Sequence, residues 1–426
     1  MTDAEASRAG ATTATGEPPA AGSPQAARMF WQYWGALTTS NLGTAVTGVA
    51  LPLTAVLVLH ATPFQMGLLA AAGYVAWLVI GLPAGALVQR YPLRRVQVSM
   101  DLVRAVAVLS LPVAWWSDRL TLVHLVVVAL VISFADVIFG VAHMTFLPRV
   151  VPKAELQSLN SLVSGTYAVT QMGGPSIGGL AVQLLGAVPT FIVDTVSYLV
   201  SAVLLCRLPD VHEPSTDTTP MRQRIREGWE FVHRHPIMGP CMWDATATNF
   251  VCGGQMALFA IYLVRELDAP AGLVGFLLAA EGIGSLVGAA LVPRLSRRFG
   301  SARLALVGGF VSVVGAFLIP VGSGAVGWFA FALGNVVFAG GVVLLSTTTR
   351  TYRQLATPPE LLSRVMATVR FVSWGAIPVG GVVFGALGGW IGLREALVVL
   401  AVLSFLSPAI LLASPVRHLR DFPEEP

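Results

Sequence analysis

The sequence predicts an all-α membrane protein with twelve transmembrane helices in two pseudo-symmetric halves of six. Of the 426 residues, 55% are hydrophobic and only 11% are charged, whereas soluble domains carry about 25% charged residues. Apolar segments long enough to cross a bilayer recur along the whole chain. The basic residues gather in alternate connections between these segments, which is the pattern of a multi-pass membrane protein.

Twelve apolar segments have spanning length, and each is expected to form a helix because none alternates apolar and polar residues as a membrane barrel strand would. Their expected bounds are residues 31–59, 64–88, 97–117, 121–146, 160–184, 188–206, 237–264, 270–293, 302–320, 324–348, 365–387 and 392–414.

The basic residues set the expected orientation. If the amino terminus is cytoplasmic, only Arg119, Arg265 and Arg394 of the 26 Lys and Arg residues fall on the outer side. The positive-inside rule then places both termini in the cytoplasm. Basic loops that meet anionic lipid headgroups explain the net charge of +4 without a nucleic-acid partner. The use of arginine over lysine indicates a GC-rich bacterial genome, and we expect the bacterial inner membrane.

The chain divides into five expected regions. They are a disordered cytoplasmic tail (1–28), a six-helix half (29–206), a cytoplasmic linker (207–236), a second six-helix half (237–414) and a cytoplasmic tail (415–426). In the linker, Ile225, Trp229 and Val232 share one face, which predicts an amphipathic helix on the inner membrane surface. A soluble helix that binds a partner protein is the alternative.

The fifth span contains the motif Gly174-Pro175-x-x-Gly178-Gly179. Basic loops follow spans two and eight, as expected of duplicated halves. Further characteristic stretches are DLVRA (101–105), LPRVVP (147–152), EGWEFVHRHP (227–236) and TPPELLSRVMA (357–367). Taken in chain order, these motifs resemble the major facilitator superfamily, in the drug:proton antiporter branch that includes macrolide exporters and the enterobactin exporter. The glycine motif of the fifth span is similar to the antiporter signature.

The resemblance implies that the signature span lies between the two halves and takes part in gating. Small residues let neighbouring helices approach closely, so the alternative is that Gly174, Gly178 and Gly179 serve only packing. Pro175 should kink the helix by removing a backbone hydrogen bond.

The resemblance also implies an inner gate in the loop after span two. Gln89 stands where the family pattern has an acidic residue, and Pro92 stands where it has glycine. Asp101 lies close to the same membrane surface, and we expect it to supply the missing charge to the loop arginines. The alternatives are that the arginines only fix topology, or that Asp101 pairs with Arg104 on its own helix. The predicted gate residues are Gly85, Gln89, Arg90, Arg94, Arg95 and Asp101.

Acidic residues within spans are the candidates for proton coupling. A charge at the centre of the bilayer costs about 2.5–3.5 kcal/mol on insertion scales, so such residues tend to be functional or paired. The candidates, in order of preference, are Glu281, Asp136, Asp244 and Asp194. Each could instead be a structural hydrogen-bonding group, which is the favoured interpretation for Asp194.

Polar and aromatic residues on spans are the candidates for substrate contact. In the family, spans one, four, seven and ten line a central cavity, and Trp374 could stack a flat ligand. Each residue alone is more often a packing residue. The candidates are Asn41, Tyr167, Gln171, Asn249, Gln255, Asn335 and Trp374.

These features together predict a monomeric, proton-coupled exporter of amphipathic or hydrophobic small molecules, such as antibiotics or siderophores, that works by alternating access. An importer, or a membrane scaffold or sensor that transports nothing, is the alternative. We expect no enzyme activity and no cofactor, because the chain has no nucleotide-binding motif. We also expect no metal, because it has no metal-type Cys/His spacing.

Overall fold

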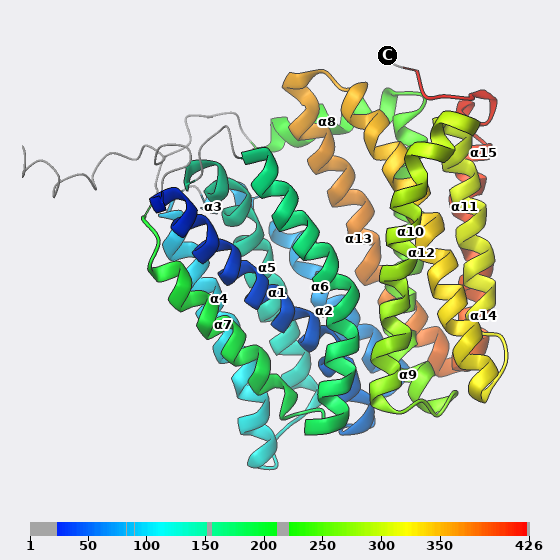
Figure 1. Cartoon of the computed structure of the whole chain (residues 1–426). Coiled ribbons are helices and arrows are strands. Elements are labelled where there is room, and N and C mark those ends of the chain that lie inside the picture. Colours follow the sequence, from blue (N-terminus) through cyan, green and yellow to red (C-terminus); the bar gives the residue numbers. More distant parts are fainter. Residues whose placement is uncertain (1–23, 82, 89, 151–155, 211–220, 424–426) are drawn as a thin grey trace, which may run out of the picture.

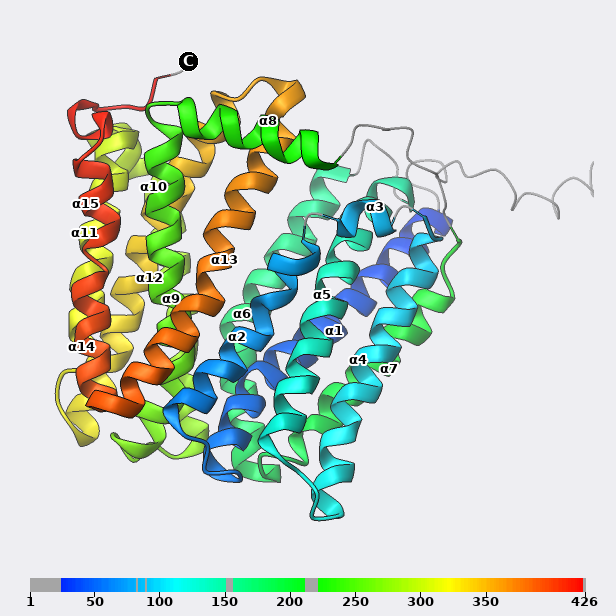
Figure 2. The ribbon, with the colours of Figure 1, turned by 180° about the vertical axis from the view of Figure 1, so that it is seen from behind.

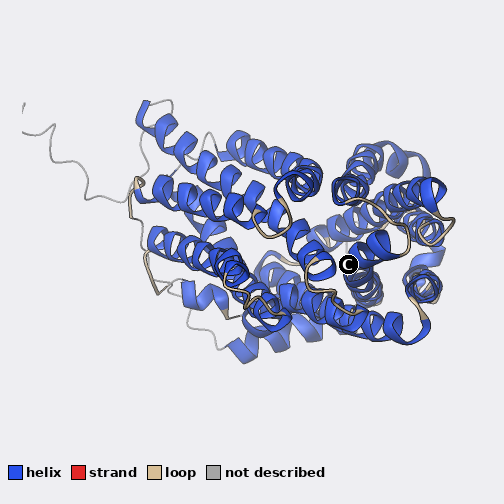
Figure 3. Ribbon diagram, turned by 90° about the horizontal axis from the view of Figure 1, so that it is seen from below, coloured by secondary structure: helices blue, strands red, loops and turns tan. Residues whose placement is uncertain are grey.

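The computed structural model describes residues 24–81, 83–88, 90–150, 156–210 and 221–423, which form helices joined by short turns (Figure 1). Figure 3 looks along these helices from one end, and no strand is drawn among them. The helices are α1 (Pro24–Leu57), α2 (Pro63–Ile80), α3 (Ala84–Val88), α4 (Leu93–Trp116), α5 (Leu122–Val150), α6 (Leu156–Leu185), α7 (Thr190–Cys206), α8 (Met221–Arg234), α9 (Met238–Arg265), α10 (Ala271–Phe299), α11 (Ser301–Leu318), α12 (Gly324–Leu355), α13 (Pro359–Ile391), α14 (Leu393–Leu403) and α15 (Leu406–Leu412).

Twelve of these segments have the length of a membrane span. Among the described residues, ten helices are both long and apolar enough to cross a membrane, with α14 and α15 counted as one. The apolar α7, of 17 residues, and α6, of 30 residues, bring the number to twelve. The prediction of an all-helical, twelve-span chain is confirmed.

Several helices extend beyond the bounds expected from hydropathy. α10 continues to Phe299, α12 continues to Leu355, and α13 begins at Pro359. Polar and basic residues can continue a helix beyond the hydrocarbon region, where hydropathy no longer detects it. α1 begins at Pro24, so residues 24–28 of the predicted tail are helical. Residues 1–23 of that tail lie outside the described part of the chain.

The second predicted span is broken. Residues 64–88 were expected to form one helix, but α2 ends at Ile80 and α3 begins at Ala84. Pro83 lies in the break. Proline has no amide hydrogen and clashes with the preceding turn, so it ends the longer helix and precedes a new, short one.

The twelve spans form two bundles, which we call the N-terminal half (α1–α7) and the C-terminal half (α9–α15) (Figure 2). The helix α8 lies across one end of α13, and we call that end of the molecule the α8 end. Glu227 of α8 forms an ion pair with Arg364 of α13. Gly228 allows this close approach, because a Cβ there would lie 2.7 Å from the carbonyl oxygen of Arg364.

Glycines bring the two halves into backbone contact near the end opposite α8. On α6, a Cβ at Gly179 would lie 2.6 Å from the Cα of Gly275 on α10. On α2, a Cβ at Gly67 would lie 2.4 Å from the carbonyl oxygen of Gly381 and 3.1 Å from the Cα of Gly385, both on α13. Two helix pairs therefore seal the seam between the halves at this end.

Toward the α8 end the halves diverge (Figures 1 and 2). No residue is buried in the stretch 160–169 of α6 or in the stretch 289–299 of α10. Since α6 and α10 are in contact farther along, between Met172 and Gly282, they separate beyond that point. The molecule is therefore closed at one end of the seam and open toward the other.

Candidate functional site

Glu281 lies on α10 at the point where the contact between α6 and α10 ends. The next residue, Gly282, packs against Met172 of α6, whereas Glu281 is exposed. Tyr74, on α2 of the opposite half, lies within electrostatic range of the Glu281 carboxylate, so this carboxylate faces the seam. Among the described residues, Glu281 forms no hydrogen bond and no ion pair. It is an uncompensated acid between the halves.

Asp136 belongs to a cluster of charges within the N-terminal half. Its carboxylate accepts a hydrogen bond of 2.6 Å from Nη1 of Arg104, while Nη2 of the same guanidinium pairs with Asp101. Asp101 also accepts a hydrogen bond of 2.6 Å from Oγ of Ser201 on α7. The cluster has two carboxylates for one guanidinium. Asp101 is fully buried, but the Asp136 side chain is 36% exposed, so Asp136 is the accessible member.

Tyr74 lies near both acidic sites, Glu281 and Asp136. It lies within electrostatic range of Asp136 and Tyr167 as well as Glu281, and Tyr167 is 51% exposed on α6. Side chains from four helices of two halves, namely α2, α5, α6 and α10, therefore gather around one region of the seam. This arrangement could bind a small molecule between the halves and exchange protons with it.

The two remaining acids lie inside their own bundles. Asp194 is buried on α7, where it accepts hydrogen bonds from Thr47 of α1 and from Oγ of Ser197. Asp244 is buried on α9 and accepts a hydrogen bond of 2.5 Å from Oγ of Ser407 on α15. Both carboxylates connect helices within one half and are set apart from the seam.

The polar candidates have differing surroundings. Gln171 is exposed on α6, and Asn41 and Asn249 are half-buried. Asn335 is buried on α12, and its Nδ2 donates a long hydrogen bond of 3.4 Å to the Leu277 carbonyl on α10, which connects two helices. Gln255 is buried on α9, and its Nε2 has no partner among the described residues.

Trp374 lies at the seam, but its ring face is in contact with an arginine. The Cζ atom of Arg370 is 4.2 Å from the centre of the Trp374 ring and 4.0 Å from that of Trp77 on α2. Trp77 and Trp374 are also in edge contact with each other. Two indole rings and one guanidinium therefore connect the two halves at this position.

The glycine signature points in two directions. A Cβ at Gly174 would lie 2.3 Å from Cβ of Ala45, and one at Gly178 would lie 3.1 Å from Cα of Val46, both on α1. Of these glycines, only Gly179 contacts α10. The carbonyl oxygen of Pro175 also contacts α10, at Gly275. The span thus lies between the halves as expected, but Gly174 and Gly178 face α1 of their own half, because successive helical residues point about 100° apart.

The expected pairing of Asp101 with the loop arginines is also wrong. Asp101 pairs with Arg104 instead, whereas Arg94 and Arg95 both pair with Asp210, after α7, at 3.3 and 2.9 Å. Asp101 is too deeply buried between α4 and α7 to meet exposed loop residues. Gly85 lies in α3, Arg90 is exposed, and Gln89 lies outside the described residues.

Comparisons with known proteins agree with this architecture. A family described as transmembrane secretion effector matches residues 20–425. This chain belongs to that family of major facilitator transporters. The multidrug efflux pump Tap of Mycolicibacterium fortuitum is 28% identical to the transporter over 407 residues, covering 92% of this chain and 97% of Tap. The MFS-type transporter YfiS of Bacillus subtilis is 27% identical over 376 residues, covering 85% and 87%.

Solved structures support the same fold. A POT family transporter superposes on this chain with a TM-score of 0.74 and 12% identity, covering 94% of this chain and 98% of that one. A bacterial homologue of ferroportin, in an inward-facing state, superposes with a TM-score of 0.71 and 15% identity, covering 91% and 98%. At these identities the likeness establishes the fold alone.

Arg370 and Tyr74 escaped the sequence analysis, and Arg104 entered it only as an alternative partner of Asp101. Both arginines lie within spans, so the insertion cost that identified the acids would also have identified them. Tyr74 carries no charge, and no signal in the sequence separates it from an ordinary packing residue.

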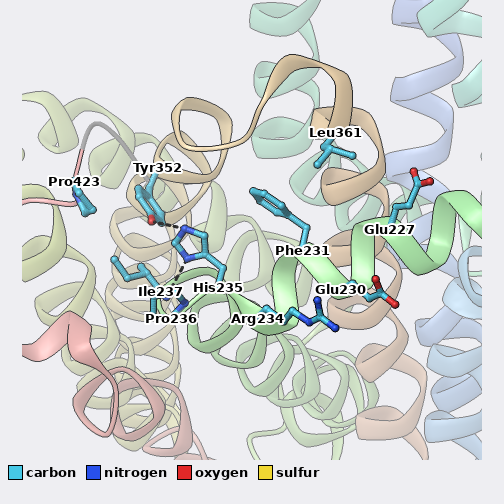
Figure 4. Close-up of a pocket in the computed structure, with 10 residues that line it drawn as sticks. All are labelled: Glu227, Glu230, Phe231, Arg234, His235, Pro236, Ile237, Tyr352, Leu361 and Pro423. Atoms are coloured by element: carbon cyan, nitrogen blue, oxygen red, sulfur yellow. Dashed lines mark hydrogen bonds between the residues drawn. The ribbon is translucent and has the colours of Figure 1, made fainter.

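A separate cavity of about 630 Å³ lies beside α8, away from the seam of the transporter (Figure 4). Its lining includes Phe231, His235 and Tyr352 but none of the acids within the spans. His235 Nδ1 accepts the amide hydrogens of Ile237 and Met238, both at 3.2 Å, at the start of α9. Its Nε2 lies 3.4 Å from the Tyr352 hydroxyl. The junction of α8 and α9 therefore forms part of the wall of this cavity.

Proposed function

We propose that this transporter is a proton-coupled exporter of amphipathic small molecules across the bacterial cytoplasmic membrane. The observation that carries the proposal is Glu281, an exposed acid at the seam between the halves that forms no ion pair with any described residue. The relatives named multidrug efflux pump Tap support the direction and the broad substrate class.

In this proposal the α8 end faces the cytoplasm. The distribution of arginine supports this orientation, since among the described residues of the C-terminal half only Arg265 and Arg394, at ends of α9 and α14, lie at the opposite end. The structure then corresponds to an inward-open state. Export requires the glycine crossings at Gly179 and Gly67 to separate while the α8 end closes.

The proposed coupling relies on competition for one carboxylate. The ionised Glu281 accepts a hydrogen bond from a polar group of a substrate that enters from the cytoplasm. After the molecule reorients, a proton from outside binds Glu281 and releases the substrate. A membrane potential contributes about 2.3 kcal/mol per charge per 100 mV. This free energy can support about a fifty-fold ratio of substrate concentrations across the membrane, because each tenfold ratio requires about 1.36 kcal/mol. Asp136 is the second proton site, because it is the accessible member of the Arg104 cluster.

A non-transporting scaffold would need no uncompensated charge in the membrane. In a scaffold, acids within spans should all be paired, as Asp136 is with Arg104. Glu281 does not follow this pattern among the described residues, and a lone ionisable group in a membrane span is costly unless function retains it. This contrast favours transport.

A susceptibility screen and a vesicle assay together test the proposal. The drug susceptibility of cells with and without the gene is compared across drug classes. Uptake of a drug to which the gene confers resistance is then measured in inverted membrane vesicles. A protonophore should abolish its uptake, and Glu281→Gln should abolish it without a protonophore. Glu266→Gln is the matched control, because Glu266 is an exposed acid outside the seam. Uptake that persists after the proton gradient collapses would overturn proton coupling.

A further inference from the structure

The Arg370 guanidinium is held between the two halves, and no described residue serves as its counter-ion. It lies against the rings of both Trp77 and Trp374, one from each half. Among the described residues it forms no ion pair, and its Nε is buried without a hydrogen-bond partner. Arg350 of α12 lies within electrostatic range and adds positive charge. The groups within electrostatic range of the Arg370 guanidinium are thus Arg350 and Tyr167, and neither is a carboxylate.

Arg104 provides an internal comparison. Its guanidinium also lies against two rings, those of Phe139 and Tyr198, at 4.5 and 4.6 Å. Yet the terminal nitrogens of Arg104 pair with the carboxylates of Asp101 and Asp136, and only its Nε lacks a partner among the described residues. Contact with two aromatic rings thus occurs once with carboxylates on the guanidinium and once without them. Such contacts restrict the orientation of the guanidinium and leave nitrogen atoms available for hydrogen bonds.

The position of Arg370 is within the membrane. It lies five residues beyond Val365, where the apolar span is expected to begin, which is about 7.5 Å along the helix at 1.5 Å per residue. An unpaired charge at such a depth is costly and tends to be kept for a functional partner. A guanidinium edge matches the two oxygens of a carboxylate, sulfonate or phosphate, and the indole rings offer flat apolar surface beside it.

We propose that Arg370, oriented by Trp77 and Trp374, binds the anionic group of a substrate with an aromatic body. This inference rests on the proposed function in one respect, namely that the substrate passes along this seam. It narrows the substrate class to molecules that join a carboxylate or a similar anion to a flat apolar skeleton. Glu281, on α10 of the same half, remains the separate site for the proton.

Matched fluorescent probes test this assignment on the purified full-length protein in nanodiscs. Pyrenebutyrate and pyrenebutanol share one aromatic skeleton, and only the first is an anion. The wild type should bind pyrenebutyrate more tightly. Arg370→Gln should weaken pyrenebutyrate binding about tenfold, as expected for loss of a charge-assisted hydrogen-bonded pair. Its affinity for pyrenebutanol should change less than twofold.

Two further variants keep the test decisive if Arg370→Gln folds poorly. Arg370→Lys keeps the charge but loses the planar fork, so it should retain part of the preference for the anion. Arg303→Gln, at an exposed arginine of α11, is the control and should bind both probes like the wild type.

Equal loss of both probes in Arg370→Gln would overturn the proposal, because Arg370 would then only connect the two halves. A wild type that does not prefer pyrenebutyrate would overturn it as well. The binding measurement uses no proton gradient, so its failure is distinguishable from the failure of proton-coupled export.

Discussion

Arg104 and Asp101 form a buried pair whose members depend on each other. The Arg104 guanidinium meets two carboxylates and two rings, and the Asp101 side chain is fully buried. Removing Arg104 leaves the buried Asp101 carboxylate without its cation, and breaking a buried ion pair in this way typically costs about 3–5 kcal/mol. Asp194 and Asp244, by contrast, are held by hydroxyl groups. The acids thus differ at the residue scale in what stabilises them.

We predict that Arg104→Gln lowers the melting temperature of the purified protein in detergent, because Asp101 and Asp136 lose their shared cation. The loss should correspond to several kcal/mol, on the order of 3. The double variant Arg104→Gln with Asp101→Asn should recover part of it, since the buried charge is then removed. A single variant that melts like the wild type would show that the pair contributes nothing to stability.

At the scale of elements, the junction of α8 and α9 depends on the neutral form of one histidine. His235 Nδ1 accepts two amide hydrogens at the start of α9, so it must be unprotonated there. Burial lowers the pKa of His235 below its usual value, which is about 6.5. The unfolded chain therefore binds a proton more readily, and the stabilisation is fully present above pH about 6.5. It is lost as the pH falls through the lowered pKa of the folded state.

We predict that acidification loosens the start of α9. Hydrogen exchange at Ile237 and Met238, corrected for intrinsic rates, should be several-fold faster near pH 5 than at pH 7.5. A helix cap is worth about 1 kcal/mol, or roughly a fivefold change. His235→Asn keeps an acceptor oxygen and should remove this pH dependence. If the Asn variant responds to pH as the wild type does, His235 is not the responsible group.

The sequence predicted the positions of the helices better than it predicted which side of each helix contacts which neighbour. Lipid requires apolar spans, so hydropathy located twelve of them, while it could not detect polar extensions such as residues 294–299 of α10. The direction in which Gly178 and Gly179 point depends on the neighbours of α6, which a single sequence does not reveal. Asp101 and Arg104 are three residues apart, so their pairing was foreseeable as an alternative. The contribution of Ser201, one hundred residues later, was not.

At the scale of the whole molecule, α6 carries contacts of three kinds. A Cβ added at Gly179 would lie 2.6 Å from the backbone of α10. A Cβ at Gly178 would lie 3.1 Å from the backbone of α1, and a Cβ at Gly173 would have no neighbour within 4 Å. Because a contact under 3.0 Å with backbone forces a shift, alanine at Gly179 should push the two halves apart. Alanine at Gly178 should instead strain packing within one half.

We predict that Gly179→Ala reduces transport and increases the separation of spin labels on Leu184 of α6 and Ala271 of α10. Gly178→Ala should lower the melting temperature with little change in that separation. Gly173→Ala is the control on the same helix and should match or exceed the wild type in stability, because alanine favours helices. Unchanged label separation in Gly179→Ala would show that this crossing does not hold the halves together.

The central claim is that substrate export and proton entry are coupled through Glu281. Purified protein in proteoliposomes that contain a pH-sensitive dye tests it most directly, with no other transporter present. A drug identified by the susceptibility screen is added outside, without an initial pH gradient. The wild type should move protons in the direction opposite to the drug, and Glu281→Gln should move none. Drug movement by the wild type without any change in internal pH would contradict the account.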